Sequence, residues 1–569
     1  MDFKPNNMKR IILISIFSFL YFSTNACTNF LITKGASADG STMISYNADS
    51  HTLYGELYYW APATYPEGTM LDVYDWDSGQ YHGKIKQALQ TYNVVGNMNE
   101  FQVAIGETTF GGLGKLHHQK DAIIDYGSLI YIALQRSKSA REAIKVMTEL
   151  VAEYGYASHG ESFSIMDANE VWVLEMIGKG DFEMGAVWVA RLIPDGYISA
   201  HANQARIMKF PQKYEEGGIS AVDIDKIYDP KVNTIYAADV ISFAKKHGFY
   251  TGKDEEFSFS DVYAPVDFGG ARFCESRVWS MFRQVNNDMD KYENYAMGFD
   301  LKNRIPLFIK PDRKVSLKDM ISFMGDHFEG TKMDFREDIG AGPFGLPYRW
   351  RGLTWKVDGQ TYFNERSTST QQTGFTFIAQ GRNQYPDPVG GILWFGVDDA
   401  YFTIYNPIFC GIRDVPISYK QGFGNMMQFE EDAAFWVFNQ VSNLAYTRYN
   451  TIGPIVKEEQ SKLEDKFIKY IGPISEAATK LYNMDKDLGL EYITDYSVNQ
   501  ADNIVQYWKK FYRFLFVKFM DGNIKKTKGR QFIDNGNGKN IPVYPDQPGY
   551  GEKTYRKIIE ETGDRYKMR

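Results

Sequence analysis

The sequence predicts an α+β fold in which two stacked antiparallel sheets are covered by helices, followed by a mainly helical C-terminal part. Strand-like runs joined by short turns recur along the first half of the chain, at 28–33 with 42–46, 91–97 with 101–109, 162–167 with 170–176, and 186–193 with 197–203. Successive hairpins of this kind build antiparallel sheets. Helical segments lie between them, which predicts outer layers of helices.

The helices are predicted from their caps and their apolar spacing. One begins at Ser139, where Glu142 completes a capping box, and ends at Gly155. A second is capped by the segment 316–319. Long helices are expected over 430–450, 455–483 and 498–520, and a short one near 553–562 within a Lys- and Gly-rich tail.

Composition excludes several classes of partner. The formal net charge is −8 over 569 residues, and 44% of the residues are hydrophobic. These are ordinary globular values, and the chain has no long basic run. Nucleic acid and anionic membrane surfaces are therefore not expected as partners, and a small or peptidic ligand is.

The first residues follow the plan of a secretory signal. Lys9 and Arg10 precede a mainly apolar stretch at 11–22, and the small residues Thr24 and Ala26 follow it. This stretch is too short to span a bilayer comfortably, and no later segment is longer, so stable membrane insertion is not expected. We expect signal peptidase to cut between Ala26 and Cys27 and the protein to be exported to the periplasm or beyond the cell.

Cys27 would then be the first residue of the mature chain. The other cysteines, Cys274 and Cys410, fit buried small hydrophobes, and whether they pair stays open. A cysteine at a free amino terminus carries a nucleophile and a base together, because the α-amine titrates near neutrality. The rival interpretation is a lipoprotein acylated on Cys27, but Thr24 and Asn25 make a poor acylation signal.

The first hairpin brings acidic and amide groups back to Cys27. Antiparallel pairing of 28–33 with 42–46 places Asn47 and Asp49 beside the amino terminus. A carboxylate there can hold the ammonium group in place. The alternative is that Asn47 and Asp49 only form a turn.

A set of strings in conserved order along the chain resembles the secreted dipeptidase family related to dipeptidase A, which are cysteine-type N-terminal nucleophile (Ntn) hydrolases. The resemblance runs from 27 to about 450 and rests on Cys27-Thr28-Asn29, the segment 35–42, Asn47-Ala48-Asp49, Gly106-Glu107-Thr108-Thr109, Trp172-Val173-Leu174-Glu175, Asn203-Gln204, Arg277-Val278-Trp279 and the segments 326–331 and 342–345. It implies an Ntn-hydrolase αββα sandwich and hydrolysis of dipeptides. It also implies kinship with penicillin V acylases and bile-salt hydrolases, so a non-peptidase hydrolase of N-acyl amides is the alternative activity.

The resemblance assigns roles to four catalytic residues. Cys27 is the nucleophile and Asp49 binds its amine, while Asn203 matches the donor to the oxyanion. Arg277 resembles a late arginine near the nucleophile, with Arg272 as the fallback. Tyr46 stands where the relatives have an arginine, which removes one cation from beside the thiol.

Substrate binding is expected at Glu107 and Thr108. An acidic side chain at Glu107 suits the cationic amino end of a dipeptide, which a neutral acyl group lacks. No cofactor or metal is expected. His117 and His118 are adjacent, His159, His201 and His327 lie far apart, and the segment 326–329 offers too few ligands. Activity is expected to resist a chelator.

These expectations divide the chain into a signal peptide at 1–26, a catalytic domain at 27–430, a helical region at 431–522 and an exposed extension at 523–569. A non-catalytic surface lipoprotein is the alternative from another functional class. A homo-oligomer is compatible with the sequence.

Overall fold

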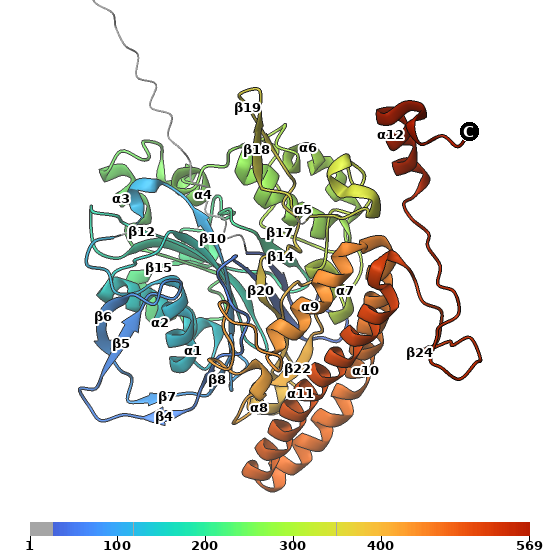
Figure 1. Cartoon of the computed structure of the whole chain (residues 1–569). Helices are drawn as coiled ribbons and strands as arrows, with labels where there is room; N and C mark the ends of the chain where they lie inside the picture. Colours follow the sequence, from blue (N-terminus) through green and yellow to red (C-terminus); the bar gives the residue numbers. More distant parts are fainter. Residues whose placement is uncertain (1–26, 118, 349) are drawn as a thin grey trace, which may run out of the picture.

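The computed structural model describes residues 27–569 apart from 118 and 349, so the expected signal peptide lies outside the described residues. Two large sheets stack on each other at the centre of the molecule (Figure 1). The seven-stranded sheet has the order β17 (Phe308–Ile309), β14 (Ile198–His201), β1 (Asn29–Ile32), β2 (Thr42–Asp49), β20 (Thr373–Gly381), β21 (Ile392–Val397) and β22 (Asn406–Phe409).

The second sheet has nine strands. Their order is β15 (Gly218–Ser220), β16 (Thr234–Tyr236), β13 (Ala186–Leu192), β12 (Val171–Gly178), β11 (Gly160–Met166), β10 (Ala104–Gly111), β9 (Met98–Asn99), β8 (Val94–Val95) and β3 (Tyr59–Trp60). All neighbouring pairs are antiparallel except β15 with β16. The two sheets face each other where β2 contacts β10 and β11. Every residue of β2, β11, β12 and β20 is buried, as expected for strands covered on both faces.

Helices form the outer layers. The nine-stranded sheet is covered by α1 (Tyr126–Arg136), α2 (Ala140–Tyr154) and α3 (Val240–Lys246). The seven-stranded sheet contacts α7 (Leu317–Met324), α9 (Ala434–Thr447), α10 (Tyr449–Met484) and α11 (Lys486–Phe519). The predicted α+β class with antiparallel sheets and a helical C-terminal part is therefore confirmed, and its layers follow the order helix, sheet, sheet, helix.

The remaining elements are short. They include the hairpins β4 (Ala63–Thr64) with β7 (Gln90–Thr91), β5 (Met70–Tyr74) with β6 (Tyr81–Lys86), and β18 (Thr354–Val357) with β19 (Gln360–Phe363), and the helices α4 (Phe259–Tyr263), α5 (Ser276–Arg283), α6 (Glu293–Ala296) and α8 (Asp387–Gly390).

The predicted helix starts are found where the caps are. Ser139 Oγ accepts a hydrogen bond from the Glu142 amide at 3.2 Å, and Gly155 ends α2 at a φ of 76°. The Glu142 carboxylate, however, accepts from the Lys138 amide at 2.7 Å, so the reciprocal half of the expected capping box is absent there. It is complete at α7, between Ser316 and Asp319.

One predicted hairpin is wrong. The segment 186–193 was expected to pair with 197–203, but β13 lies in the nine-stranded sheet beside β12 and β16, whereas β14 lies in the seven-stranded sheet beside β1 and β17. The turn at 194–196 therefore carries the chain from one sheet to the other. Similarly, 91–109 forms three strands, β8, β9 and β10, where two were expected.

The C-terminal helices complete the sandwich. The helices α10 and α11 form a long hairpin against β22 (Figure 1), and α11 begins at Lys486, not near 498, because Asp485 caps it. Beyond them the chain is largely exposed and runs through β23 (Thr527–Lys528), β24 (Gln531–Phe532) and α12 (Glu552–Thr562). Within the described residues, no helix combines the length and apolarity needed to cross a bilayer.

Candidate active site

Cys27 lies two residues before the start of β1, at the end of the first hairpin that is opposite its turn. The Asn47 amide donates to the Thr28 carbonyl at 3.0 Å, so the end of β2 returns to the start of β1. Cys27 is only 7% exposed, and it shares a cavity with Asp49. The expected return of the hairpin to Cys27 is thus present.

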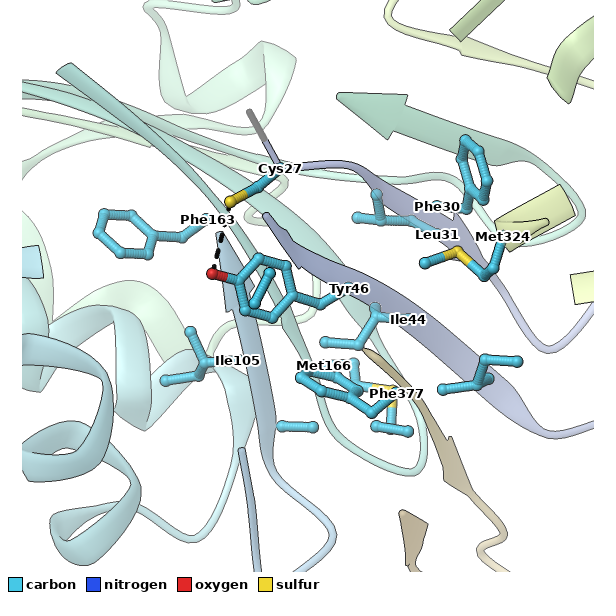
Figure 2. Close-up of a cluster of buried hydrophobic side chains, with 14 of the residues drawn as sticks. Cys27, Phe30, Leu31, Ile44, Tyr46, Ile105, Phe163, Met166, Met324 and Phe377 are labelled. Carbon is cyan, nitrogen blue, oxygen red and sulfur yellow. Dashed lines mark hydrogen bonds between the residues drawn. The ribbon is translucent and has the colours of Figure 1, made fainter. Parts of the chain in front are cut away.

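Tyr46 links the thiol to the opposite sheet. The Cys27 thiol lies 3.6 Å from Tyr46 Oη, and Tyr46 Oη in turn donates to the Glu107 carboxylate on β10. Figure 2 shows the Tyr46 ring among apolar side chains that include Phe377, with its hydroxyl turned toward Cys27. At the position where the resemblance implies an arginine, this chain therefore has a tyrosine whose hydroxyl connects the thiol to Glu107 by hydrogen bonds.

Gly106 allows this bridge to form. A Cβ atom built at Gly106 would lie 2.3 Å from Asn29 Oδ1 and 3.4 Å from Tyr46 Cβ. The first distance is far below van der Waals contact. Only glycine lets β10 approach β1 and β2 closely enough for Glu107 to meet the Tyr46 hydroxyl.

Arg277 fixes the backbone of Cys27 and the side chain of Asn203. From the fully buried start of α5, its Nη1 donates to the Cys27 carbonyl at 2.6 Å and its Nη2 to Asn203 Oδ1 at 2.9 Å. Burial and the nearby Arg366 charge lower the pKa of Arg277 to about 10, so it is cationic at neutral pH. The fallback residue, Arg272, pairs with Glu365 instead.

Asn203 is held in an unusual backbone conformation just beyond β14. Its φ is 65°, and its Nδ2 donates to the Thr109 carbonyl at 2.7 Å while its Oδ1 accepts from Arg277. A side-chain amide has two N–H donors, so the second one is available to a ligand. The positive φ is a strain that functional sites commonly carry.

The Asp49 carboxylate is paired with an arginine that the sequence did not reveal. Arg366 Nη2 lies 2.6 Å from Asp49 Oδ2, and Thr373 Oγ1 donates to Asp49 Oδ1 at 2.6 Å. Burial raises the pKa of Asp49, and the Arg366 charge opposes this rise. Arg366 lies in an irregular segment after the exposed hairpin of β18 and β19, where no local signal marks it.

The environment of Cys27 favours the neutral thiol. Burial raises the pKa of Cys27 well above its usual range, and the charges of Glu107 and Asp49 raise it further, against smaller opposing effects of the Asp49 amide and the Tyr46 hydroxyl. The side chains lining its cavity include no histidine among the described residues. A base close to the thiol is therefore needed for attack on a carbonyl.

Glu107, which lines the cavity of Cys27, has a second acidic side chain, Glu161, next to it. Burial raises the pKa of both Glu107 and Glu161, and the Glu107 charge raises that of Glu161 further. Oε2 of each carboxyl is buried and accepts no hydrogen bond from an N–H or hydroxyl group of the described residues. A cationic ligand in the cavity could satisfy Glu107 Oε2.

Thr108 does not face this site. Its hydroxyl is buried between the sheets and lies 2.7 Å from His201 Nδ1. Thr109, one residue on, lines the cavity of Cys27 and bonds to Glu161 Oε1 at 2.8 Å. The structure thus places Thr109, and not the predicted Thr108, where a substrate could touch it.

Thr109 lines two cavities. The smaller, of about 100 Å³, is lined by Cys27, Asp49, Asp77 and Glu107. The larger, of about 670 Å³, is lined by a different set that includes Asn203, Arg277 and Arg366. The thiol thus lies in the narrow acidic cavity, whereas Asn203 and Arg277 line the wider one.

Comparison with known proteins gives a consistent family. The model of peptidase family C69 matches residues 26–462. A probable dipeptidase of Latilactobacillus sakei is 24% identical over 84% of this chain and 89% of its own length. A probable dipeptidase of Salmonella dublin is 22% identical over 68% of this chain and 82% of its own, and probable dipeptidase B of Lactococcus lactis subsp. lactis (strain IL1403) is 22% identical over 75% and 82%. The family model spans most of the chain, so this protein belongs to peptidase family C69.

Proposed function

We propose that this protein is an exported cysteine dipeptidase in which Cys27, freed by removal of residues 1–26, is the N-terminal nucleophile. The observation that carries the proposal is the position of the thiol: it is buried at the head of β1, hydrogen-bonded to Tyr46, and faces the acidic cavity of Glu107. The names of the relatives support dipeptides as the substrates.

The reaction begins with transfer of the thiol proton to the α-amine of Cys27. That amine is basic only after cleavage, because a peptide nitrogen is not. Asp49, held by Arg366 and Thr373, orients the resulting ammonium. Sγ then attacks the scissile carbonyl, and the second N–H of Asn203 stabilises the oxyanion.

The tetrahedral intermediate collapses when the leaving amine takes the proton from the Cys27 ammonium. A thioester of the first residue remains on Sγ, and water activated by the same α-amine hydrolyses it. Arg277 keeps the Cys27 carbonyl and the Asn203 amide in register through both steps. It is a positioning residue, since its contacts are with these two groups.

The acidic cavity explains why a dipeptide suits the site better than an N-acyl amide. The free ammonium of the substrate can meet Glu107, whose Oε2 accepts no hydrogen bond from an N–H or hydroxyl group of the described residues, whereas an acylated nitrogen brings no charge to offset the burial of this carboxylate. The lipoprotein alternative fits the site poorly, because a cavity of about 100 Å³ around a 7% exposed residue has no room for a diacylglyceryl group.

Intact-mass measurement of the exported protein tests the proposal. The chain is expressed with its own leader, recovered from the exported fraction and incubated with an aminoacyl analogue that carries a thiol-reactive group. We expect a chain that begins at Cys27 and gains one adduct, and no adduct on Cys27→Ser. A lipid on Cys27, or full dipeptidase activity in Cys27→Ser, would refute it.

A further inference from the structure

Asp75, His82 and Asp125 form a cluster that the proposed mechanism does not use. Asp75 follows β5, His82 lies on β6, and Asp125 is the N-cap of α1. One ligand atom from each lies within 4.8 Å of the other two. The hairpin of β5 and β6 and the helix α1 therefore meet at three groups that commonly bind metal ions.

The Asp125 carboxylate is only half satisfied. Its Oδ1 accepts from the amides of Gly127 at 2.9 Å and Ser128 at 3.1 Å, which caps α1. Its Oδ2 is buried and accepts no hydrogen bond from the described residues, and Asp125 itself is 0% exposed. A buried carboxylate oxygen of this kind calls for a cation.

No side-chain cation of the hairpin supplies that charge. Lys84 Nζ pairs with Asp72 at 3.5 Å, and Lys86 Nζ pairs with Glu153 at 3.2 Å. The Asp75 carboxylate instead brings a second negative charge to within 4.8 Å of Asp125. Two carboxylates facing each other without a lysine or arginine are stabilised by a bound cation.

The ring of His82 is held by a backbone carbonyl. Its Nδ1 lies 3.3 Å from the Ile123 carbonyl, an acceptor that fixes the proton on Nδ1 and leaves the lone pair on Nε2. A backbone carbonyl behind the ring is the usual support of a ligating histidine. Two carboxylates and one imidazole favour a divalent first-row ion such as Zn²⁺ over Ca²⁺ or Mg²⁺.

We propose that Asp75, His82 and Asp125 bind one divalent transition-metal ion, with water in its remaining positions. With bonds of about 2.0 to 2.2 Å, neighbouring ligands of a tetrahedral ion lie roughly 3.4 Å apart. The three ligand atoms lie within 4.8 Å of one another, so each separation needs to shorten by at most about 1.4 Å to reach that spacing. The site is structural, because the Cys27 chemistry does not pass through it.

The ion would fix one wall of the active-site cavity. Trp76 and Asp77 directly follow Asp75 and line that cavity, and the Tyr126 hydroxyl donates to Asp77 Oδ1 at 2.8 Å. Each of the segments 75–77 and 125–126 thus begins with a proposed metal ligand and continues with residues that line the cavity. Binding of the ion ties the β5–β6 hairpin to α1 at the point where both approach the thiol.

Metal binding is measured on the full mature chain carrying Cys27→Ser, which removes the thiol as a competing ligand. After dialysis against a chelator, Zn²⁺ is titrated by calorimetry and the bound metal is counted after desalting. We expect one ion per chain and a rise in Tm of about 2 °C when Zn²⁺ exceeds its Kd a hundredfold.

His82→Gln and Asp125→Asn should each weaken Zn²⁺ binding at least about tenfold. Asparagine caps a helix as well as aspartate does, so Asp125→Asn keeps α1 intact. Asp72→Asn is the matched control, since it removes one carboxylate from the same hairpin outside the cluster and should leave binding unchanged. The inference is overturned if Cys27→Ser binds no Zn²⁺, or if Zn²⁺ binding survives both cluster variants.

Discussion

Replacing Glu107 by glutamine should abolish the preference of the enzyme for dipeptides with a free amino terminus over the same dipeptides with an acylated one. Glutamine keeps an oxygen that can accept from Tyr46, so the hydrogen bond between β2 and β10 is retained. What is lost is the negative charge that would meet the substrate ammonium. A hydrogen bond to a charged group contributes about 1.5 to 3 kcal/mol.

That energy corresponds to a loss of roughly 10- to 150-fold in kcat/KM, since 1.36 kcal/mol is a factor of ten. The loss should appear for a dipeptide and be absent for the same dipeptide carrying an N-acetyl group. The assay is release of the C-terminal amino acid, quantified by chromatography for both substrates at pH 7.

Glu161→Gln is the matched control. Burial and the Glu107 charge raise the pKa of Glu161, and Glu161 does not line the cavity of Cys27, so its replacement should leave in place the charge that meets the substrate. We expect kcat/KM for the dipeptide to change by less than about threefold. Equal losses for both substrates in Glu107→Gln, or a larger loss in Glu161→Gln, would refute this account of amine recognition.

Three further perturbations have defined outcomes. Arg366→Met should lower the free energy of unfolding by about 3 to 5 kcal/mol, because it leaves the buried Asp49 carboxylate unpaired. Urea titration measures this loss. The double variant with Asp49→Asn should recover part of it. Gly106→Ala should reduce kcat without altering the pH profile, because its Cβ would clash with Asn29 and move Glu107 from Tyr46; wild-type kcat would contradict this. Burial lowers the pKa of His201 to about 3, so the unfolded chain binds a proton first as pH falls below about 6.5, and stability at pH 5 should be about 2 kcal/mol lower than at pH 7.5 from this group. His201→Gln should remove that part of the pH dependence, as the urea midpoints at the two pH values will show.

Local patterns were enough to predict the frame of the site. Cys27 and Asp49 meet because a short hairpin has a defined register, and the starts of α2 and α7 are found at Ser139 and Ser316 because capping is set by neighbouring residues. The position of Thr109 was also within reach. Alternate residues of a strand share a face, so Thr109, and not Thr108, accompanies Glu107.

Contacts between residues far apart in the chain could not be predicted from the sequence. Arg366 reaches Asp49 across more than three hundred residues from an irregular segment, and no periodicity or cap leads to it. A turn such as 194–196 indicates that the chain reverses but not whether the next strand joins the same sheet, which is why β13 and β14 were wrongly paired. Asp125 shows the same limit. The sequence marks it as a helix cap, but only the structure shows that His82 and Asp75 lie close to its carboxylate.

The burial of Cys27 also sets an order of events in biogenesis. Once β1 has paired with β2 and β14, the carbonyl of Cys27 is bound by Arg277 and its side chain is enclosed, so the residue after the proposed cut is already held in place. On the proposed export route, we therefore expect the leader to be removed while this segment is still unfolded. Maturation and folding would then compete in time, and a chain that folds before it is cut would be trapped with an acylated, non-basic nitrogen beside an intact thiol.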